Sequence, residues 1–199
     1  MSYQGKGLII FIKNPVLGSV KTRLARTIGN EEALNVYQLL LQCTRDTVLQ
    51  LNGIQLHLFY SDVIDIADQW ENQFFYKNVQ SGEDLGQKMS RAFKEILAIN
   101  EHVLIIGSDC PYLTPAMIDN AFEQLLDHDL VIGPAKDGGY YLLGMKTLMP
   151  EIFHKVAWST PYVFQQTLDI AERLGKSCFI LEELSDIDEW EDWVAFVGS

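Results

Sequence analysis

The sequence predicts a layered α/β fold built on a mostly parallel β-sheet. Short apolar segments alternate with longer segments of helical periodicity along the chain. Two of the short segments, Leu8–Ile12 and Val103–Ile106, are continuously apolar, as are parallel strands buried on both faces. No linker, repeat or low-complexity stretch interrupts the 199 residues, so we expect a single domain over residues 1–199.

The strands and helices are predicted from length and spacing. Strands are predicted at Gly7–Ile12, Ile54–Tyr60, Phe74–Val79, His102–Gly107, Leu130–Gly133, Gly139–Met145 and Ser177–Leu181. Amphipathic helices are predicted at Glu31–Leu51, Leu85–Ile99, Pro115–Leu126 and Pro161–Leu174. In open sheets of this kind ligands bind outside the carboxyl ends of the strands, so residues that follow strands are the candidates for function.

Composition limits the classes of function and partner. The net charge of −12 argues against a nucleic-acid partner, because phosphate backbones are bound by broad basic surfaces. The three cysteines are odd in number and form no C-x-x-C pair, which argues against a disulfide framework or a zinc site. No apolar run is long enough for a membrane span or a secretory signal, so we expect a cytoplasmic protein without a membrane partner.

The first predicted strand leads into the basic loop, Lys13–Leu24. Pro15 and Gly18 favour a turn, after which Lys21, Thr22 and Arg23 precede a helix, and no acidic residue occurs before Glu31. Phosphate is bound by such a combination of cations and backbone N–H groups at a helix start. The alternative is a helix-capping loop whose cations are solvated. The loop is not a Walker loop, because G-x-x-x-x-G-K-[ST] is absent.

Four later segments are further candidates. Asp109, after the strand that ends at Gly107, is placed to bind Mg²⁺ together with phosphate oxygens, or to cap the helix near Pro115. The Lys136–Gly139 segment is either a hairpin turn or a place where backbone approaches a ligand. Gln80–Met89 contains Asp84 as a helix N-cap. In the acidic 184–193 segment, Asp186 and Asp188 share one side of an extended chain, which offers a second metal ligand, or else this is a solvated face.

Together these segments resemble the GT-A (nucleotide-diphospho-sugar transferase) superfamily. The resemblance is strongest to bacterial transferases labelled glycosyltransferase-like or radical-SAM/selenodomain-associated. They share F-x-K-x-P-x-x-G-x-V-K-T-R-L-A, matched by Phe11–Ala25, then Q-x-G-x-D-L-G, G-x-D-x-P, D-G-G-Y-Y-L-x-G, W-S-T and D-x-D. More distant similarity runs to guanylyltransferases that act on molybdenum cofactor and on 2-phospho-lactate. The resemblance implies a three-layer GT-A or Rossmann-like fold. The chain lacks the Gly-rich G-x-G-[ST]-R of sugar nucleotidyltransferases.

The resemblance also implies roles for individual residues. Asp109, Lys21 and Arg23 are the expected catalytic residues, and Asp109 and Asp188 the expected metal ligands. The acceptor is expected to face Asp137, Gly138 and Gly139. The nucleotide is expected to contact Lys13, Gly18, Lys21, Thr22, Arg23, Gln80, Gly82, Asp84 and Leu85.

These roles predict an Mg²⁺-dependent nucleotidyltransferase. It would pass a nucleotidyl group from a nucleoside triphosphate to a small phosphorylated acceptor, releasing pyrophosphate. The alternative is a glycosyltransferase that uses a nucleotide sugar as donor. A non-catalytic nucleotide-binding module is disfavoured, because both candidate metal carboxylates accompany the basic loop. The base, the acceptor and the oligomeric state, monomer or homodimer, stay open.

Overall fold

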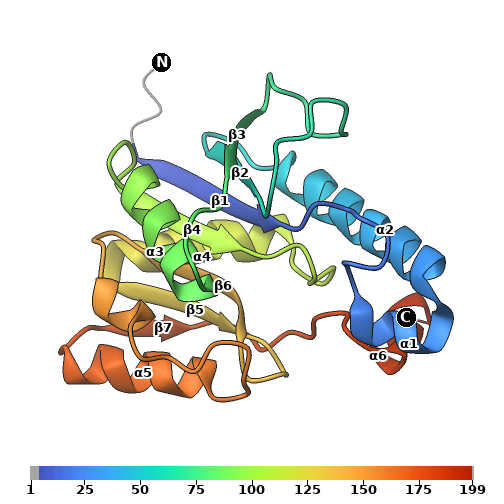
Figure 1. Cartoon of the computed structure of the whole chain (residues 1–199). Helices are drawn as coiled ribbons and strands as arrows, with labels where there is room; N and C mark the ends of the chain where they lie inside the picture. The colour runs from blue at the N-terminus through green and yellow to red at the C-terminus, as the bar shows by residue number, and fades with distance from the viewer. Residues whose placement is uncertain (1–4, 199) are drawn as a thin grey trace.

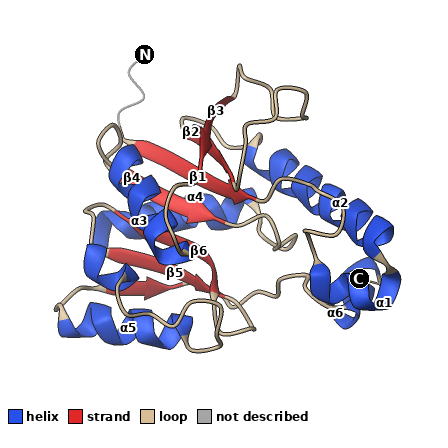
Figure 2. Cartoon of the chain, viewed as in Figure 1, coloured by secondary structure: helices blue, strands red, loops and turns tan. Residues whose placement is uncertain are grey.

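A computed structural model describes residues 5–198 and contains one seven-stranded sheet (Figures 1 and 2). Its strands are β1 (Lys6–Ile12), β2 (Gln55–Tyr60), β3 (Phe75–Val79), β4 (His102–Ile106), β5 (Leu130–Pro134), β6 (Tyr140–Met145) and β7 (Cys178–Ile180). Their order across the sheet is β3-β2-β1-β4-β6-β5-β7. Only β6 runs against its neighbours, so the prediction of a mostly parallel sheet is confirmed.

Helices cover both faces of the sheet and give three layers (Figure 1). They are α1 (Thr22–Ile28), α2 (Asn30–Val48), α3 (Leu85–Ile96), α4 (Pro115–Asp127), the 3₁₀ helix η1 (Pro150–Phe153), α5 (Val163–Arg173) and α6 (Trp190–Val197). Helices α2 and α4 pack on one face, while α3, η1 and α5 pack on the other. The predicted layered α/β class is therefore confirmed.

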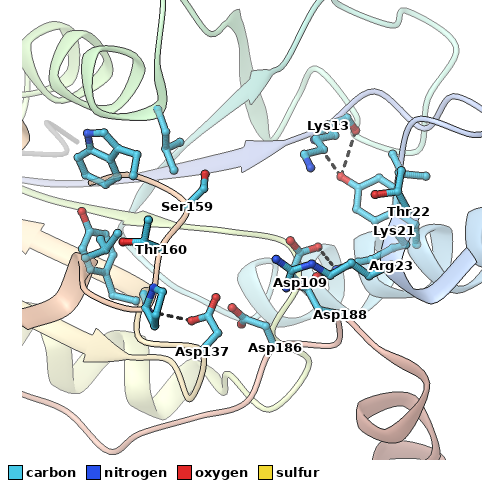
Figure 3. Close-up of a pocket in the computed structure, with 18 of the residues that line it drawn as sticks. Lys13, Lys21, Thr22, Arg23, Asp109, Asp137, Ser159, Thr160, Asp186 and Asp188 are labelled. Atoms are coloured by element: carbon cyan, nitrogen blue, oxygen red, sulfur yellow. Dashed lines mark hydrogen bonds and ion pairs between the residues drawn. The ribbon is translucent and has the colours of Figure 1, made fainter. Parts of the chain in front are cut away.

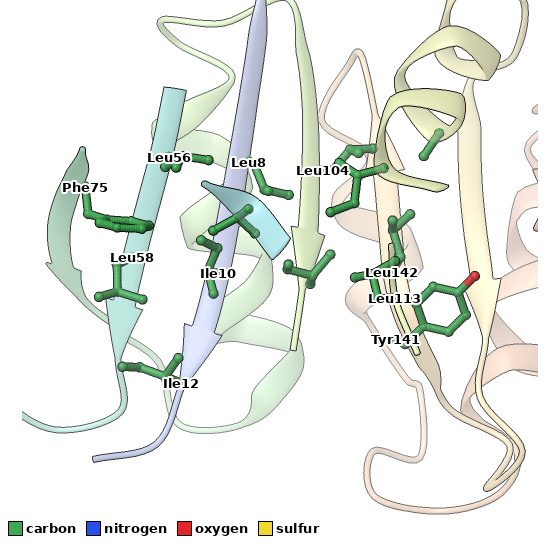
Figure 4. Packing of buried hydrophobic residues seen from close by; sticks show 14 of the residues in the cluster. Leu8, Ile10, Ile12, Leu56, Leu58, Phe75, Leu104, Leu113, Tyr141 and Leu142 are labelled. Carbon is green, nitrogen blue, oxygen red and sulfur yellow. The ribbon is translucent and has the colours of Figure 1, made fainter. Parts of the chain in front are cut away.

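The alternation of side chains along β1 divides the core into two layers. Leu8 and Ile10 point to the cluster that includes residues of α2 and α4, whereas Ile9 points to the cluster that includes residues of α3 (Figure 4). All three side chains are fully buried, which is why this strand reads as one unbroken apolar run. The doubly covered sheet fixes where each strand ends, and so fixes the loops that follow.

The structure differs from the sequence prediction mainly in short helices that were not predicted. The predicted helix Glu31–Leu51 is preceded by the separate α1, and the left-handed φ of 85° at Gly29 divides the two. The acidic segment near the C-terminus continues into α6, which the sequence analysis did not predict. A capping box between Glu189 and Asp192 starts this helix, so part of the acidic run is capping chemistry.

Within residues 5–198, no helix is long and apolar enough to cross a membrane.

Candidate active site

A cleft of about 620 Å³ opens at the carboxyl ends of the parallel strands (Figure 3). Its volume is within the range of small-molecule sites, and its place follows the rule for open α/β sheets. The loops after β1, β4, β5 and β7 supply most of its polar residues. These are Lys13, Ser19, Lys21, Thr22, Arg23, Asp109, Asp137, Asp186 and Asp188, joined by Ser159 and Thr160 from the loop before α5.

Lys21 is the centre of the charged network in this cleft. Its Nζ lies 2.7 Å from Asp109 Oδ1 and 3.3 Å from Asp188 Oδ1, while Arg23 Nη1 lies 3.8 Å from Asp188 Oδ2. Burial lowers the pKa of the Lys21 ammonium, but the two carboxylates outweigh burial and hold it above its usual value. From the sequence, Lys21 and Arg23 are both expected to contact a bound nucleotide. In the structure they converge on Asp188.

The backbone aims Lys21 at these carboxylates. Lys21 occupies the N-cap position of α1 with φ of 47°, in the left-handed region that non-glycine residues rarely adopt. Its side chain is only 3% exposed, whereas those of Asp109 and Asp188 are 41% and 42% exposed. The lysine therefore lies behind the carboxylates, and the carboxylates face the cleft.

Tyr37 of α2 ties the basic loop to the Asp109 loop. Its hydroxyl accepts from the Lys13 N–H at 2.8 Å, donates to the Lys13 carbonyl at 3.1 Å, and lies 3.3 Å from Ser108 Oγ. Burial and the Asp109 charge raise the pKa of Tyr37 well above its usual value, so the phenol stays protonated. One buried hydroxyl thus joins the two loops that carry Lys13 and Asp109.

Asp186 lies between Asp137 and the Lys21 network (Figure 3). Burial, together with the Asp109 and Asp137 charges, raises its pKa to about 7. Ile187 between Asp186 and Asp188 is fully buried, and its N–H donates to the Asp109 carbonyl at 2.9 Å. The extended backbone therefore turns both acidic side chains toward the cleft, as the alternation argument expected.

Residues 158–163 form the wall opposite the basic loop. The Trp158 indole packs so closely on α3 that a Cβ at Gly86 would lie 2.3 Å from its Nε1. Phe164 N–H donates to the Gly138 carbonyl at 2.9 Å, which joins this wall to the β5–β6 turn. Leu85, Tyr140 and Val163 complete an apolar and aromatic surface beside Trp158.

Five residues of the predicted site do not line the cleft. Gln80 Nε2 donates to the Ile12 and Phe59 carbonyls, so its amide joins loops. Asp84 caps α3 by accepting from the Gln87 N–H at 2.7 Å. Gly82 and Gly138 have positive φ, and added Cβ atoms would meet Lys88 N at 2.8 Å and the Pro161 carbonyl at 2.1 Å. Gly18 is the turn residue of the basic loop, with φ of 78°.

The other predicted residues come together in the cleft. They are Lys13, Lys21, Thr22, Arg23, Leu85, Asp109, Asp137, Gly139 and Asp188. Helix-capping by Asp109 is wrong, because Thr114 caps α4. The hairpin interpretation of Lys136–Gly139 is confirmed, since this segment joins antiparallel β5 and β6.

Sequence reasoning missed Tyr37, Tyr140 and Trp158 as residues of the cleft. Tyr37 lies within the predicted helix Glu31–Leu51, and the contacts of its hydroxyl depend on where two distant loops lie. The signal for Trp158 was present in the W-S-T motif, which the sequence analysis quoted without assigning a role.

Two carboxylates fit a divalent cation that is also held by substrate phosphates. Within residues 5–198, no group of three or more His, Cys, Asp or Glu side chains is arranged to hold a metal ion. Mg²⁺ is commonly bound through one or two carboxylates, with waters and phosphate oxygens as its other ligands. Asp109 and Asp188, already converging on one ammonium, match that requirement.

A protein-family model described as "Uncharacterized protein conserved in bacteria (DUF2064)" matches residues 44–160. Among curated proteins, a 2-phospho-L-lactate guanylyltransferase from Methanocaldococcus jannaschii is 29% identical over 132 residues. That match covers 66% of this chain and 56% of the relative. The chain thus spans little more than half the length of the curated relatives it matches.

Solved structures share the fold over nearly the whole chain. A protein from Desulfovibrio desulfuricans G20, assigned as a nucleotide-diphospho-sugar transferase, superposes with a TM-score of 0.89 at 28% identity. The match covers 98% of this chain and 87% of that one. The 4-diphosphocytidyl-2C-methyl-D-erythritol synthase of Anaerococcus prevotii DSM 20548 superposes with a TM-score of 0.65 at 14% identity, covering 99% and 97% of the two chains. This second likeness is one of fold.

Proposed function

The chain belongs to the bacterial family DUF2064, and we propose that it is a metal-dependent nucleotidyltransferase. In this proposal, Mg²⁺ assists transfer of a nucleotidyl group from a nucleoside triphosphate to a small phosphorylated acceptor. The observation that carries the proposal is the Lys21 network, in which a lysine and an arginine adjoin two carboxylates that face the cleft. The guanylyltransferase relatives support the same class of reaction.

The basic loop would hold the triphosphate. Lys13 and Arg23 are exposed at the mouth of the cleft, where their side chains can donate to phosphate oxygens. Lys21 is buried behind Asp109 and Asp188 and would keep both carboxylates in place. Asp109 and Asp188 would hold Mg²⁺, which when bound neutralises phosphate charge and polarises the phosphoryl group.

The transfer itself is a direct displacement. An oxygen of the acceptor phosphate bonds to the α-phosphorus of the nucleotide, and the bond from that phosphorus to the bridging oxygen of pyrophosphate breaks. A phosphate monoester is already an anion, so this attack needs no general base. The cations of the basic loop would stabilise the negative charge that develops on the leaving pyrophosphate.

Glycosyl transfer is the second candidate, and the Desulfovibrio desulfuricans relative specifically favours it. A nucleotide sugar would place its diphosphate on the same cations, but the leaving group would be a nucleoside diphosphate. The two reactions therefore share a binding site and differ in their product.

The product decides between them. The protein is incubated with Mg²⁺, each nucleoside triphosphate and a set of small phosphate monoesters, and in parallel with nucleotide sugars. The proposal predicts acceptor-dependent pyrophosphate, which is lost in Asp109→Asn and kept in Asp119→Asn. Asp119 is exposed on α4 and does not line the cleft, so this variant removes the same charge elsewhere. Release of only nucleoside diphosphate from sugar donors would favour the second candidate.

A further inference from the structure

The two ends of the cleft offer a ligand side chains of different charge. The basic-loop end contains Lys13, Lys21 and Arg23, which are the only Lys or Arg side chains among the described residues that line the cleft. The far end is defined by Asp137, Gly139, Tyr140 and residues 158–160, and Asp186 lies between the two ends (Figure 3). Lys136, next to Asp137 in sequence, borders a different pocket, so it does not offset the charge of Asp137 from within the cleft.

The acidic side chains of the cleft differ in whether a Lys or Arg side chain pairs with them. Asp109 and Asp188 contact Lys21, and Arg23 also approaches Asp188. A divalent cation on Asp109 and Asp188 would add positive charge at the basic-loop end of the cleft. Asp137 and Asp186 form no ion pair within 4.0 Å in residues 5–198.

The far end is also held in one shape. Asp137 Oδ1 accepts from the Gly139 N–H at 2.8 Å, which orients the carboxylate, and Gly138 packs directly on Pro161. Ser159 sits in the left-handed region with φ of 62°, and its side chain is exposed at the cleft. Thr160 Oγ1 donates to the Ala157 carbonyl at 2.6 Å. These contacts present carboxylate and hydroxyl oxygens beside the indole of Trp158.

We propose that the acceptor carries hydroxyl or ammonium donors at the end remote from its phosphate, and that a carboxylate there is selected against. This inference rests on the proposed function, which assigns the phosphates to the basic-loop end. A donor group would hydrogen-bond to Asp137, Asp186 and Ser159. A carboxylate in the same place would meet the Asp137 carboxylate, which the Gly139 N–H holds in place and no Lys or Arg side chain pairs with in residues 5–198. The chain would then differ in acceptor from its 2-phospho-L-lactate guanylyltransferase relatives, whose named substrate is a carboxylic acid.

Three small phosphate monoesters test this selection. Glycerol 3-phosphate and 3-phosphoglycerate differ only in a terminal hydroxymethyl or carboxylate group, and phosphoethanolamine offers an ammonium. Binding of each is measured by calorimetry in the presence of Mg²⁺ and a non-hydrolysable nucleoside triphosphate analogue. We expect glycerol 3-phosphate or phosphoethanolamine to bind on the order of tenfold or more tightly than 3-phosphoglycerate. Comparing glycerol 3-phosphate with phosphoethanolamine shows whether the far end prefers a hydroxyl or an ammonium donor.

Variants at Asp137 assign the selection to the far end. Asp137→Lys should reverse the preference toward 3-phosphoglycerate, and Asp137→Asn, which keeps an oxygen to accept from Gly139, should weaken it. Glu183→Lys makes the same charge reversal at an exposed position outside the cleft and should leave the preference unchanged. Equal binding of the three ligands, tighter binding of 3-phosphoglycerate, or no measurable binding of any would overturn the inference. Pyrophosphate release, measured separately, tests the proposed function: binding selectivity without pyrophosphate would count against that function alone.

Discussion

Two buried lysines of this chain pair with carboxylates in different ways. Lys77 of β3 pairs with Asp68 at 2.7 Å, and their side chains are 9% and 13% exposed. The Tyr60 hydroxyl also donates to Asp68, and the Trp70 N–H does so at 2.9 Å. The Lys21 side chain is only 3% exposed, but it is shared by Asp109 and Asp188, and both carboxylates are more than 40% exposed.

From this difference we infer that Lys77 makes a structural ion pair, whereas the Lys21 network serves the proposed function. At Lys77 one cation pairs with one anion. Neighbouring donors also satisfy the Asp68 carboxylate, so little of its charge or hydrogen-bonding capacity is available to a ligand. At Lys21 one cation meets two anions that open onto a cleft, which leaves negative charge available to a divalent ion. Burial of a lysine alone would not have distinguished them.

The largest expected effect is on catalysis, from Asp109→Asn. Removing this charge should lower the rate of nucleotidyl transfer at least about a hundredfold, the scale for losing an electrostatic group at the reacting phosphates. The free energy of unfolding should change by less than about 1 kcal/mol, because the side chain is half-exposed and Lys21 keeps Asp188. Initial rates and urea denaturation measure the two quantities. A large loss of stability would make Asp109 a structural residue.

Asp68→Asn should lower stability and leave nucleotide binding almost unchanged. It leaves Lys77 buried without a matching charge, so we expect a loss of about 3 kcal/mol in the free energy of unfolding. Nucleotide affinity should stay within about twofold of the wild type, as Asp68 does not line the cleft. Urea denaturation and calorimetry with nucleotide test the pair of expectations. If folded Asp68→Asn lost nucleotide affinity, the Lys77 pair would not be purely structural, and the proposed difference from Lys21 would be wrong.

Tyr37→Phe tests whether the Tyr37 hydroxyl positions the basic loop and the Asp109 loop for nucleotide binding. The variant removes the hydroxyl that accepts from Lys13 N–H and donates to its carbonyl, and we expect a stability loss of about 1 kcal/mol. Because the ring still fills its place, any fall in nucleotide affinity beyond that of Tyr76→Phe reports on loop position. Tyr76 is exposed on β3 and does not line the cleft. Identical affinities for the two variants would show that Tyr37 does not position the loops for nucleotide.

The smallest expected effect is on stability, at His57, a buried side chain with no oppositely charged partner among residues 5–198. It is 3% exposed on β2, and burial lowers the pKa of its imidazole to about 4 from its usual 6.5. The unfolded chain therefore binds more protons between these values, so stability should fall as pH drops below about 6.5 and level off below about 4. Between pH 7 and 5.5 this amounts to roughly 1 kcal/mol. His57→Gln should flatten that part of the stability profile, and an unchanged slope would assign the acid sensitivity elsewhere.

The sheet was predictable from the sequence because its strands are marked by local signals. Ile9 and Leu104 lie in unbroken apolar runs, and all seven predicted strands overlap the observed ones. Asp109 and Lys21 were likewise singled out because each lies in the loop that follows a predicted strand. The ion pair between them was not predictable, since the left-handed conformation of Lys21 turns its side chain back toward Asp109. Gln80 and Gly138 matched a motif, yet their contacts are with neighbouring backbone.

Calorimetric binding of each nucleoside triphosphate, with Mg²⁺, to the wild type, Arg23→Ala and Arg26→Ala decides whether the basic loop holds the triphosphate. Arg23 lines the cleft, whereas Arg26 is exposed on the same helix and does not. If the basic loop binds the triphosphate, Arg23→Ala weakens the preferred nucleotide by about tenfold or more, the loss expected for hydrogen bonds to a charged group. Arg26→Ala then binds like the wild type. Undiminished binding by Arg23→Ala, or equal losses in both variants, would contradict a phosphate site at this loop.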